Sequence, residues 1–354
     1  MQFRVNPSSS LILRMLLCAL WAALFVPLLP AQEPATESRD SNIETFKVDV
    51  NVVNLFFNVK DKRGALIPSL NREQLEVYED GKPQTIKYFN AESDLPLTLG
   101  LLLDTSLSQE QVLASEKQVA ASFLREVLRP KDLAFLISFD VNVDLLHDYT
   151  NSNDELRSAL SRARVNSGGG GGSLPGMGGG PFPGSSIPRG TLLFDAIYLA
   201  GYEKLASEVG RKAMIILTDG GDQGSKMGVQ DAIEAAQKAD AVAYVILIAD
   251  RGFYGGLGYT GDRDMKKLAE ACGGRVIEVG NKPEKLREAF DQIASELRSQ
   301  YNIGYTPTNN KADGTFRRVE IRPKSKDYRV QARTGYFAHG SKSPEAGNRE
   351  TKRR

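Results

Sequence analysis

Oxygen-bearing side chains follow two apolar stretches of the sequence at the point where each stretch ends. Residues 97–103 form an apolar run, and residues 104–108 (Asp-Thr-Ser-Leu-Ser) come directly after it. A second apolar run, residues 213–218, leads into Asp219 and a pair of glycines. Because ligands of open α/β sheets bind beyond the carboxyl ends of parallel strands, we expect both sets of oxygens on a shared rim. Carboxylates and hydroxyls are ligands of hard cations such as Mg²⁺, so the pattern predicts a divalent-cation site.

The composition is that of an ordinary globular protein. The chain has 354 residues, of which 41% are hydrophobic and 25% charged, enough for a large core and typical of two domains. Its 45 basic residues nearly balance its 44 acidic residues, which gives no bulk attraction to nucleic acid. We therefore expect no nucleic-acid partner.

The first 31 residues have the pattern of a cleaved secretory signal peptide. Two arginines precede an apolar stretch at residues 15–29 that is short for a membrane span, and Ala31 stands at a suitable cleavage position. We expect an exported protein, periplasmic or extracellular, that meets the membrane only through this segment; an uncleaved anchor is the alternative. Cleavage would remove Cys18 and leave only Cys272, which excludes an intramolecular disulfide.

The central part of the chain, residues 95–300, alternates apolar strands with amphipathic helices. This alternation is typical of an α/β fold with a doubly wound, mostly parallel sheet. Predicted strands cover residues 97–103, 133–139, 143–146, 213–218, 242–249 and 275–279. Predicted helices cover residues 112–127, 154–164, 192–206, 229–239, 264–271 and 283–299. Residues 166–190 interrupt the pattern with glycine runs that lack a phosphate-binding spacing, so we interpret them as a flexible surface insertion.

Both flanks of this central part are rich in strand patterns. Strands are expected within residues 46–60, 75–89, 301–305, 316–323 and 328–334. Each flank alone leaves an apolar face uncovered, so we expect residues 46–94 and 301–338 to join in one small β-sandwich; two separate β appendages are the alternative. Residues 32–45 would form a linker and residues 339–354 a disordered basic tail.

A set of five residues resembles the metal-ion-dependent adhesion site (MIDAS) of von Willebrand factor A (VWFA) domains in residue type, order and spacing. The set consists of Asp104, Ser106, Ser108, Thr191 and Asp219. Further motifs resemble the exported VWFA-related proteins abundant in acidobacteria, and the similarity covers nearly the whole mature chain. These motifs lie at residues 61–64, 78–81, 271–275 and 301–307.

The resemblance implies a von Willebrand A-type, Rossmann-like fold for residues 95–300 and a metal site built from those five residues. The hydroxyls would be neutral ligands and the two carboxylates would balance the charge of Mg²⁺, with Mn²⁺ or Ca²⁺ as alternatives. An open coordination position would accept an Asp or Glu carboxylate of a partner protein. The implied function is a non-enzymatic, metal-dependent protein-binding or adhesion module. Leu107 stands where the family has Gly, which affects the shape of the loop rather than coordination.

Four of the polar residues also have a purely local interpretation. Ser108, with a glutamine three residues later, has the pattern of a helix capping box, and Thr191 is an N-cap candidate for the next helix. Asp219 and Asp222, which flank a pair of glycines, fit a turn. The occurrence of all five predicted ligands together is what favours the metal site.

The sequence contains few of the residues and motifs that an enzymatic function would need. There are two histidines, His147 and His339, and no serine-hydrolase elbow or zinc-hydrolase helix motif. We expect His147 to form a surface pair with the neighbouring aspartate and Cys272 to be inert. Mg²⁺-dependent phosphoryl transfer with Asp104 as nucleophile is chemically feasible, but a serine stands where a second acid is needed.

A further alternative assigns recognition to the β-sandwich, with the metal site only stabilising the fold. Residues 251–259, a loop rich in aromatic residues, could also contact a partner or pack on their own domain. The sequence leaves these alternatives open.

Overall fold

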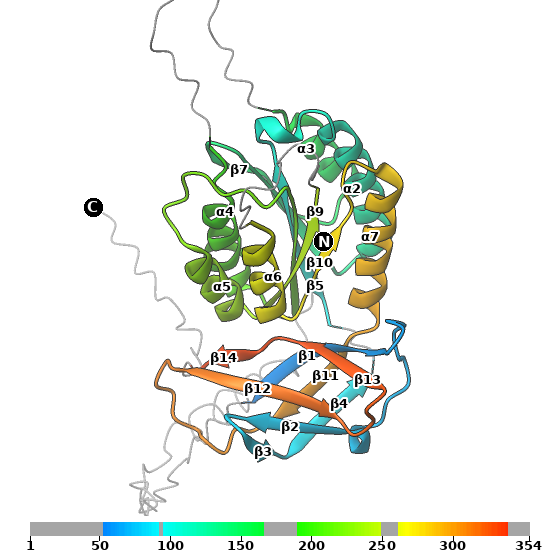
Figure 1. Cartoon of the computed structure of the whole chain (residues 1–354), viewed down its shortest axis with the longest axis vertical. Coiled ribbons are helices and arrows are strands. Elements are labelled where there is room, and N and C mark those ends of the chain that lie inside the picture. The colour runs from blue at the N-terminus through cyan, green and yellow to red at the C-terminus, as the bar shows by residue number, and fades with distance from the viewer. Residues whose placement is uncertain (1–51, 92–94, 166–189, 249–260, 339–354) are drawn as a thin grey trace, which may run out of the picture. The chain divides into compact units, whose positions relative to one another are not determined.

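Two assemblies of strands make up the described part of the chain (Figure 1). The computed structural model describes residues 52–91, 95–165, 190–248 and 261–338. One assembly is a six-stranded, mostly parallel sheet with helices on both faces, and the other is a sandwich of two four-stranded antiparallel sheets. The predicted fold class, a doubly wound α/β sheet with a β-sandwich formed by both flanks, is confirmed.

The six-stranded sheet has the order β10-β9-β8-β5-β6-β7. Its strands are β5 (Leu97–Asp104), β6 (Leu133–Phe139), β7 (Val143–Thr150), β8 (Arg211–Thr218), β9 (Ala241–Leu247) and β10 (Val276–Glu278). All neighbours are parallel except β7, which pairs antiparallel with β6 as in the predicted hairpin. Every residue of β5 is buried, because the strand lies inside the sheet and helices cover both of its faces.

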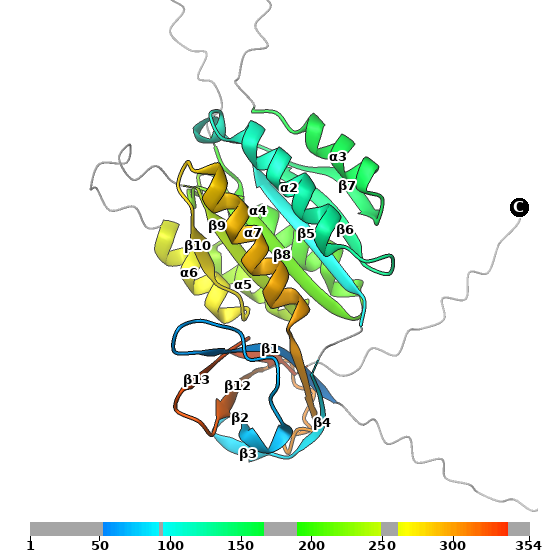
Figure 2. The same cartoon turned by 90° about the vertical axis from the view of Figure 1, so that its right-hand side faces the viewer.

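Helices cover the two faces of this sheet (Figure 2). One face carries α2 (Leu113–Val127), α3 (Asn153–Arg162) and α7 (Pro283–Arg298), and the other carries α4 (Leu193–Leu199), α5 (Val229–Lys238) and α6 (Gly261–Ala271). Successive residues of β5 point to opposite faces of the sheet. Leu101 and Leu103 pack in the core beneath α2, α3 and α7, and Leu102 packs in the core beneath α4, α5 and α6. A 3-10 turn, η2 (Leu107–Gln109), lies between β5 and α2.

The helix predicted over residues 192–206 is shorter than expected. α4 is followed by a π-helical turn, η3 (Ala200–Lys204), and a 3-10 turn, η4 (Leu205–Ser207). The π-helical turn contains Gly201, where a Cβ atom would lie 2.8 Å from the carbonyl carbon of Ala235 on α5. Close packing against α5, which local helix propensity does not reveal, therefore accompanies the change of helix type.

The sandwich contains strands from both flanks in each of its sheets. One sheet has the order β13-β1-β11-β4 and the other has the order β14-β12-β2-β3. The strands are β1 (Val53–Asp61), β2 (Leu75–Glu79), β3 (Lys82–Gln84), β4 (Ile86–Ala91), β11 (Tyr301–Tyr305), β12 (Phe316–Pro323), β13 (Tyr328–Ala332) and β14 (Gly335–Phe337), with the turn η1 (Arg72–Gln74) before β2. β1 pairs with β11 and β13, and β2 pairs with β12, so neither flank completes a sheet alone. The alternative of two separate appendages is wrong.

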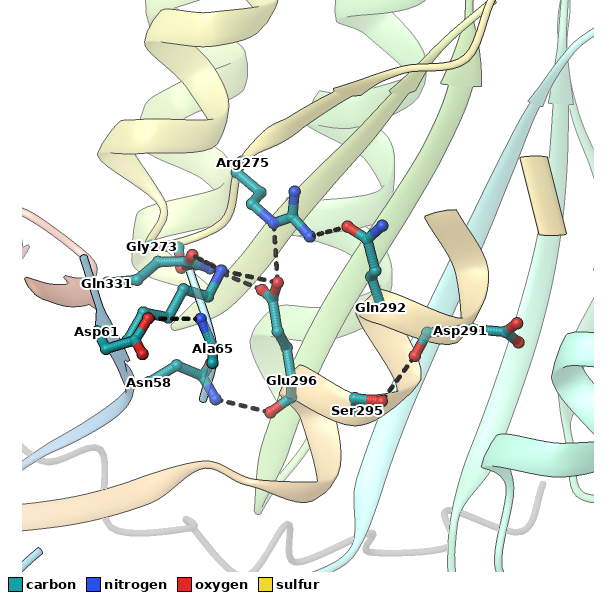
Figure 3. A network of polar contacts seen from close by, with 11 residues as sticks. Asn58, Asp61, Ala65, Gly273, Arg275, Asp291, Gln292, Ser295, Glu296 and Gln331 are labelled. Atoms are coloured by element: carbon teal, nitrogen blue, oxygen red, sulfur yellow. Dashed lines mark hydrogen bonds and ion pairs between the residues drawn. The ribbon is translucent and has the colours of Figure 1, made fainter. Parts of the chain in front are cut away.

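Polar contacts join the sandwich to the end of α7 (Figure 3). The carboxylate of Glu296, which is 2% exposed, accepts hydrogen bonds from Lys60 Nζ (2.8 Å), Arg275 Nε (2.8 Å) and Gln331 Nε2 (3.0 Å). Its carbonyl oxygen accepts one from Asn58 Nδ2 (2.8 Å). Strands β1 and β13 are thereby tied to the helix that leads into β11.

Several predictions lie outside the described residues. They concern the signal segment 1–31, the linker 32–45, the insertion up to residue 189, the loop 251–259 and the tail 339–354. No helix within the described ranges is long and apolar enough to cross a membrane.

A buried carboxylate links the two sheets of the sandwich. Glu79 on β2 is 2% exposed and accepts hydrogen bonds from the hydroxyls of Tyr305 on β11 (2.8 Å) and Tyr336 on β14 (2.9 Å). Burial, and then the hydrogen bond to Glu79, raises the pKa of both tyrosines, so both hydroxyls remain donors at neutral pH.

We expect Tyr305→Phe to lower the free energy of unfolding by about 1–3 kcal/mol, because the buried carboxylate loses a donor while the ring packing is kept. Urea denaturation followed by circular dichroism measures the change. Tyr88→Phe is the matched control, since Tyr88 is 57% exposed. Equal losses in the two variants would contradict the role given to Glu79.

Candidate metal-binding site

The carboxyl ends of β5 and β8 lie side by side and bring two predicted site segments together. Parallel pairing places Leu103 opposite Leu217, so Asp104 and Thr218 end their strands next to each other. The Thr218 hydroxyl donates a hydrogen bond to Asp104 Oδ2 at 2.7 Å. The two strand ends therefore share one rim, and Thr218 is a contributor to it that was not among the predicted site residues.

The loop after β5 turns back over its own aspartate. The N–H of Ser106 donates to Asp104 Oδ1 at 2.9 Å, and the Oγ atoms of Ser106 and Ser108 lie 3.0 Å apart. The turn η2 follows, and α2 begins only at Leu113, with no side-chain hydrogen bond capping it. The helix-cap interpretation of Ser108 is therefore wrong, and its hydroxyl faces that of Ser106 instead.

Backbone hydrogen bonds hold Thr191 between two other loops. Its N–H donates to Gln223 O (3.0 Å) and its carbonyl accepts from Gln223 N–H (2.9 Å), while Leu192 N–H donates to Asp140 O (2.8 Å) just after β6. Gly190 permits this approach, since a Cβ atom there would lie 2.9 Å from Gln223 O. Thr191 thus lies where the loops after β6 and β8 meet. No hydrogen bond between described residues joins it to the other four predicted ligands.

Thr191 does not cap the helix that follows it. α4 begins at Leu193, and the Asp222 carboxylate accepts hydrogen bonds from Phe194 N–H (3.1 Å) and the Ser225 hydroxyl (2.6 Å). Asp222, predicted as a turn residue, therefore accepts a backbone hydrogen bond from the first turn of α4. The N-cap interpretation of Thr191 is wrong.

Asp219 organises the turn after β8. It is 5% exposed, and its Oδ1 accepts a hydrogen bond from Gly221 N–H at 2.9 Å. Gly220 between them has a φ of +86°, a conformation that favours glycine. The turn interpretation of Asp219 is correct for this local geometry, and its charge acts on the neighbouring strand end as well.

Asp104 is a fully buried carboxylate close to another negative charge. Its exposed fraction is 0%. Burial and the charge of Asp219 raise the pKa of Asp104 to about 7, against the lowering effect of hydrogen bonds from Ser106 and Thr218. Two carboxylates that repel each other at the end of a sheet form an arrangement that a divalent cation would relieve.

Glu116 on α2 is a third acid near these two, and it was missed from the sequence. It is 1% exposed, and neither of its carboxylate oxygens has a hydrogen-bond partner among the described residues. Burial, then the charges of Asp104 and Asp219, raises the pKa of Glu116 to about 8. The signal that could have found it is an acid on the apolar face of the helix predicted over residues 112–127.

The donor set suits a hard divalent cation. Two carboxylates and three hydroxyls offer only oxygen, the ligand atom of Mg²⁺, Mn²⁺ and Ca²⁺. The unsatisfied oxygens of Glu116 add acceptors close to that set. In the part of the chain that the structure describes, no three His, Cys, Asp or Glu side chains lie close enough to hold a metal ion by themselves.

The Cys272 thiol and the His147 imidazole, the two other side chains considered for catalysis, lie in surroundings unlike those of Asp104. Burial raises the pKa of the Cys272 thiol to about 12, so it stays protonated at neutral pH. His147 Nε2 lies 3.6 Å from a carboxylate oxygen of Glu155, whereas the Asp148 carboxylate pairs with Lys204. The predicted surface pair of His147 with Asp148 forms through the backbone, since His147 Nδ1 lies 2.7 Å from the carbonyl oxygen of Asp148.

No protein-family model matches the chain, and neither does any curated protein sequence. Solved structures do. The chain is similar in fold to von Willebrand A domains. The vWF domain of the type V pili tip protein Mfa5 from Porphyromonas gingivalis is 13% identical and covers 57% of this chain and 95% of its own (TM-score 0.41).

Two further structures share this similarity. The von Willebrand factor type A protein from Catenulispora acidiphila is 12% identical and covers 82% of this chain and 73% of its own (TM-score 0.43). The conserved hypothetical protein BatB from Bacteroides thetaiotaomicron is 20% identical and covers 57% of this chain and all of its own (TM-score 0.41). Likeness at this level concerns the fold alone, so the site is argued from its own residues.

We expect Thr218→Val to raise the pKa of Asp104 further, because it removes a hydrogen bond that favours the ionised carboxylate. Carbon-13 NMR titration of the aspartate side chains in metal-free protein measures the shift. Thr105→Val is the matched control, since the buried Thr105 hydroxyl bonds to Asp140 rather than Asp104. A pKa that stays constant in Thr218→Val would contradict this assignment.

The metal-free protein should lose stability as the pH rises. Asp104 and Glu116 ionise near 3.8 and 4.5 when unfolded, but near 7 and 8 when folded. The folded state therefore holds more protons between about pH 4 and pH 8, so the free energy of unfolding falls across this window by several kcal/mol, since each pKa unit corresponds to about 1.4 kcal/mol. Denaturation in EDTA at several pH values measures the fall.

Asp104→Asn should flatten this pH dependence, because it removes one of the two perturbed acids. The exposed Asp144 gives the control variant, Asp144→Asn, which should keep the full fall. The assignment fails if the wild type and Asp104→Asn show the same pH dependence.

Proposed function

We propose that the chain is an exported, non-enzymatic protein-binding module that uses a divalent cation to bind an Asp or Glu carboxylate of a partner protein. The cation would be Mg²⁺, with Mn²⁺ or Ca²⁺ as alternatives, held by Asp104, Ser106, Ser108, Thr191 and Asp219. The observation that carries the proposal is the buried pair of repelling carboxylates, Asp104 and Asp219, close to hydroxyls that cap no helix. Export is proposed from residues 1–31 alone.

The exposure of the donors favours a site that opens to solvent on one side. Asp104 is fully buried and Ser106 is 8% exposed, whereas Ser108 lies at the surface. A cation held by the buried carboxylate and the serine hydroxyls would remain accessible on the hydroxyl side. The ligands on that side are neutral hydroxyls, so an open coordination position there would accept one more carboxylate oxygen.

An apolar side chain at the same opening favours a protein over a free anion as the ligand. Leu107 stands between the two serines and is 54% exposed. A polypeptide that brought its carboxylate to the cation would also cover this leucine. Because about half of the side chain is already covered, burying the rest would contribute about 1 kcal/mol, a gain that a small anion cannot supply.

The geometry disfavours Asp104 as the nucleophile of a phosphoryl transfer. Its carboxylate is fully buried, and its two oxygens accept hydrogen bonds from Ser106 N–H and the Thr218 hydroxyl. A nucleophile must be ionised and must reach the phosphorus atom, which full burial and a pKa of about 7 both oppose. We therefore propose no enzymatic function.

Titration calorimetry of Mg²⁺, Mn²⁺ and Ca²⁺ into the chain without residues 1–31 tests the metal site. We expect the wild type to bind and Asp104→Ala and Ser106→Ala to lose most of the affinity, because each removes a proposed ligand. Asp144→Ala, at an exposed position on β7, is the control and should bind as the wild type does. A wild type that binds none of the three cations would overturn the proposal.

Partner capture from a periplasmic or extracellular fraction, with Mg²⁺ or with EDTA, tests the function. We expect one captured protein to disappear in EDTA and in Asp104→Ala. A partner that stays bound under both conditions would instead assign recognition to the β-sandwich. Phosphatase activity that is lost in Asp104→Asn would support phosphoryl transfer.

A further inference from the structure

Glu116 is a buried acid whose polar atoms nothing in the described chain satisfies. It lies on the buried face of α2 together with apolar residues such as Val119 and Phe123. It is 1% exposed, and both carboxylate oxygens lack a hydrogen-bond partner among the described residues. An unsatisfied buried polar group costs on the order of 1–3 kcal/mol and more when charged, whereas leucine would fit this face without that cost. A group kept at such a cost points to an interaction made with something besides the described residues.

The acids whose charges act on Glu116 are acceptors as well, and the same segment carries a second unsatisfied acceptor. The charges that act on its carboxyl are those of Asp104 and Asp219, both negative. Gln109, on the turn η2 between β5 and α2, is also 1% exposed, and its Oε1 has no hydrogen-bond partner within the described ranges. The unsatisfied oxygens of Glu116 and Gln109 are acceptors, and neither ionised aspartate can donate a hydrogen bond to them. The hydrogens of water bound to a cation would supply donors to such oxygens.

A direct bond from Glu116 to the cation is not what the geometry favours. Among the described residues, no three acidic, histidine or cysteine side chains lie close enough together to hold one ion. Glu116, Asp104 and Asp219 therefore do not form such a group, although the charges of both aspartates act on Glu116. A cation-bound water would let Glu116 interact with the site without a direct bond, because water bound to a metal is a strong hydrogen-bond donor.

We propose that Glu116 is a positioning residue of the metal centre, which accepts a hydrogen bond from a cation-bound water and adds a third negative charge around the dication. This inference rests on the proposed function, because it needs the cation at Asp104 and Asp219. α2 thereby becomes part of the site, although none of its residues coordinates the metal.

Calorimetric titration of Mg²⁺ and Mn²⁺ into the mature chain compares the wild type with Glu116→Gln. The substitution keeps the shape of the side chain and removes its charge. We expect the dissociation constant for Mg²⁺ to rise about 10–100-fold, as is usual when a group that supports metal ligands is removed. Glu110→Gln, an exposed glutamate on the same connection, is the matched control and should leave the constant unchanged.

Thermal unfolding of the metal-free variants separates this role from a structural one. Loss of a repelled buried charge should leave the melting temperature of metal-free Glu116→Gln equal to or above that of the wild type at pH 8. A residue needed only for folding would lower it and leave metal affinity unchanged. If Glu116→Gln yields no folded protein, Glu116→Leu, which suits the apolar face of α2, serves in the same comparison.

The outcomes distinguish this inference from the function on which it rests. A wild type that binds Mg²⁺, with Glu116→Gln binding equally well, overturns the role of Glu116 and leaves the proposed metal site standing. A wild type that binds neither Mg²⁺ nor Mn²⁺ overturns the metal site and this inference together. Weaker binding in Glu116→Gln with unchanged binding in Glu110→Gln supports it.

Discussion

Burial of like charges at the carboxyl end of the six-stranded sheet is the constraint on which the rest of the structure depends. β5 delivers Asp104 into an environment that helices on both faces keep dry, and Asp219 follows the neighbouring strand. Desolvation and repulsion raise the pKa of Asp104 to about 7, so the folded chain holds this acid only at a cost in free energy. An arrangement of this kind is typical of functional sites, since a bound cation recovers that free energy as affinity.

The backbone, more than the side chains, fixes where the hydroxyls lie. The hydrogen bond from the Ser106 N–H to the Asp104 carboxylate fixes the position of Ser106. Two backbone hydrogen bonds with Gln223 fix the position of Thr191. The Asp222 carboxylate, rather than the Thr191 hydroxyl, accepts a hydrogen bond from the first turn of α4. Loops held by several backbone bonds lose little entropy when a ligand binds, so a cation would meet a largely preorganised donor set.

Strand patterns in the sequence were strong predictors, and local interpretations of single residues were weak ones. Strands β6, β11 and β12 have the predicted bounds, because apolar runs or strict alternation end there at turn residues. Helix-cap patterns at Ser108 and Thr191 proved wrong, because a 3-10 turn and a long-range pairing with Gln223 decide those conformations. Glu116 escaped prediction because an acid within an amphipathic helix is normally solvated. Its position on the apolar face of α2 was the one sequence signal of burial, and the extent of that burial depends on the packing of α2 against the sheet.

The α/β sheet is inserted between two strands that pair with each other. β4 ends at Ala91, β11 begins at Tyr301, and these two residues are partners in one antiparallel ladder. During synthesis β1 and β4 must wait for their partner strands, and β2 for its partner β12, until the whole insert has been made. An insert that folds first holds its own ends together, which lowers the entropy lost when β4 and β11 pair. The connectivity thus favours an order of assembly in which the sheet that bears the candidate metal site forms before the sandwich closes around its two ends.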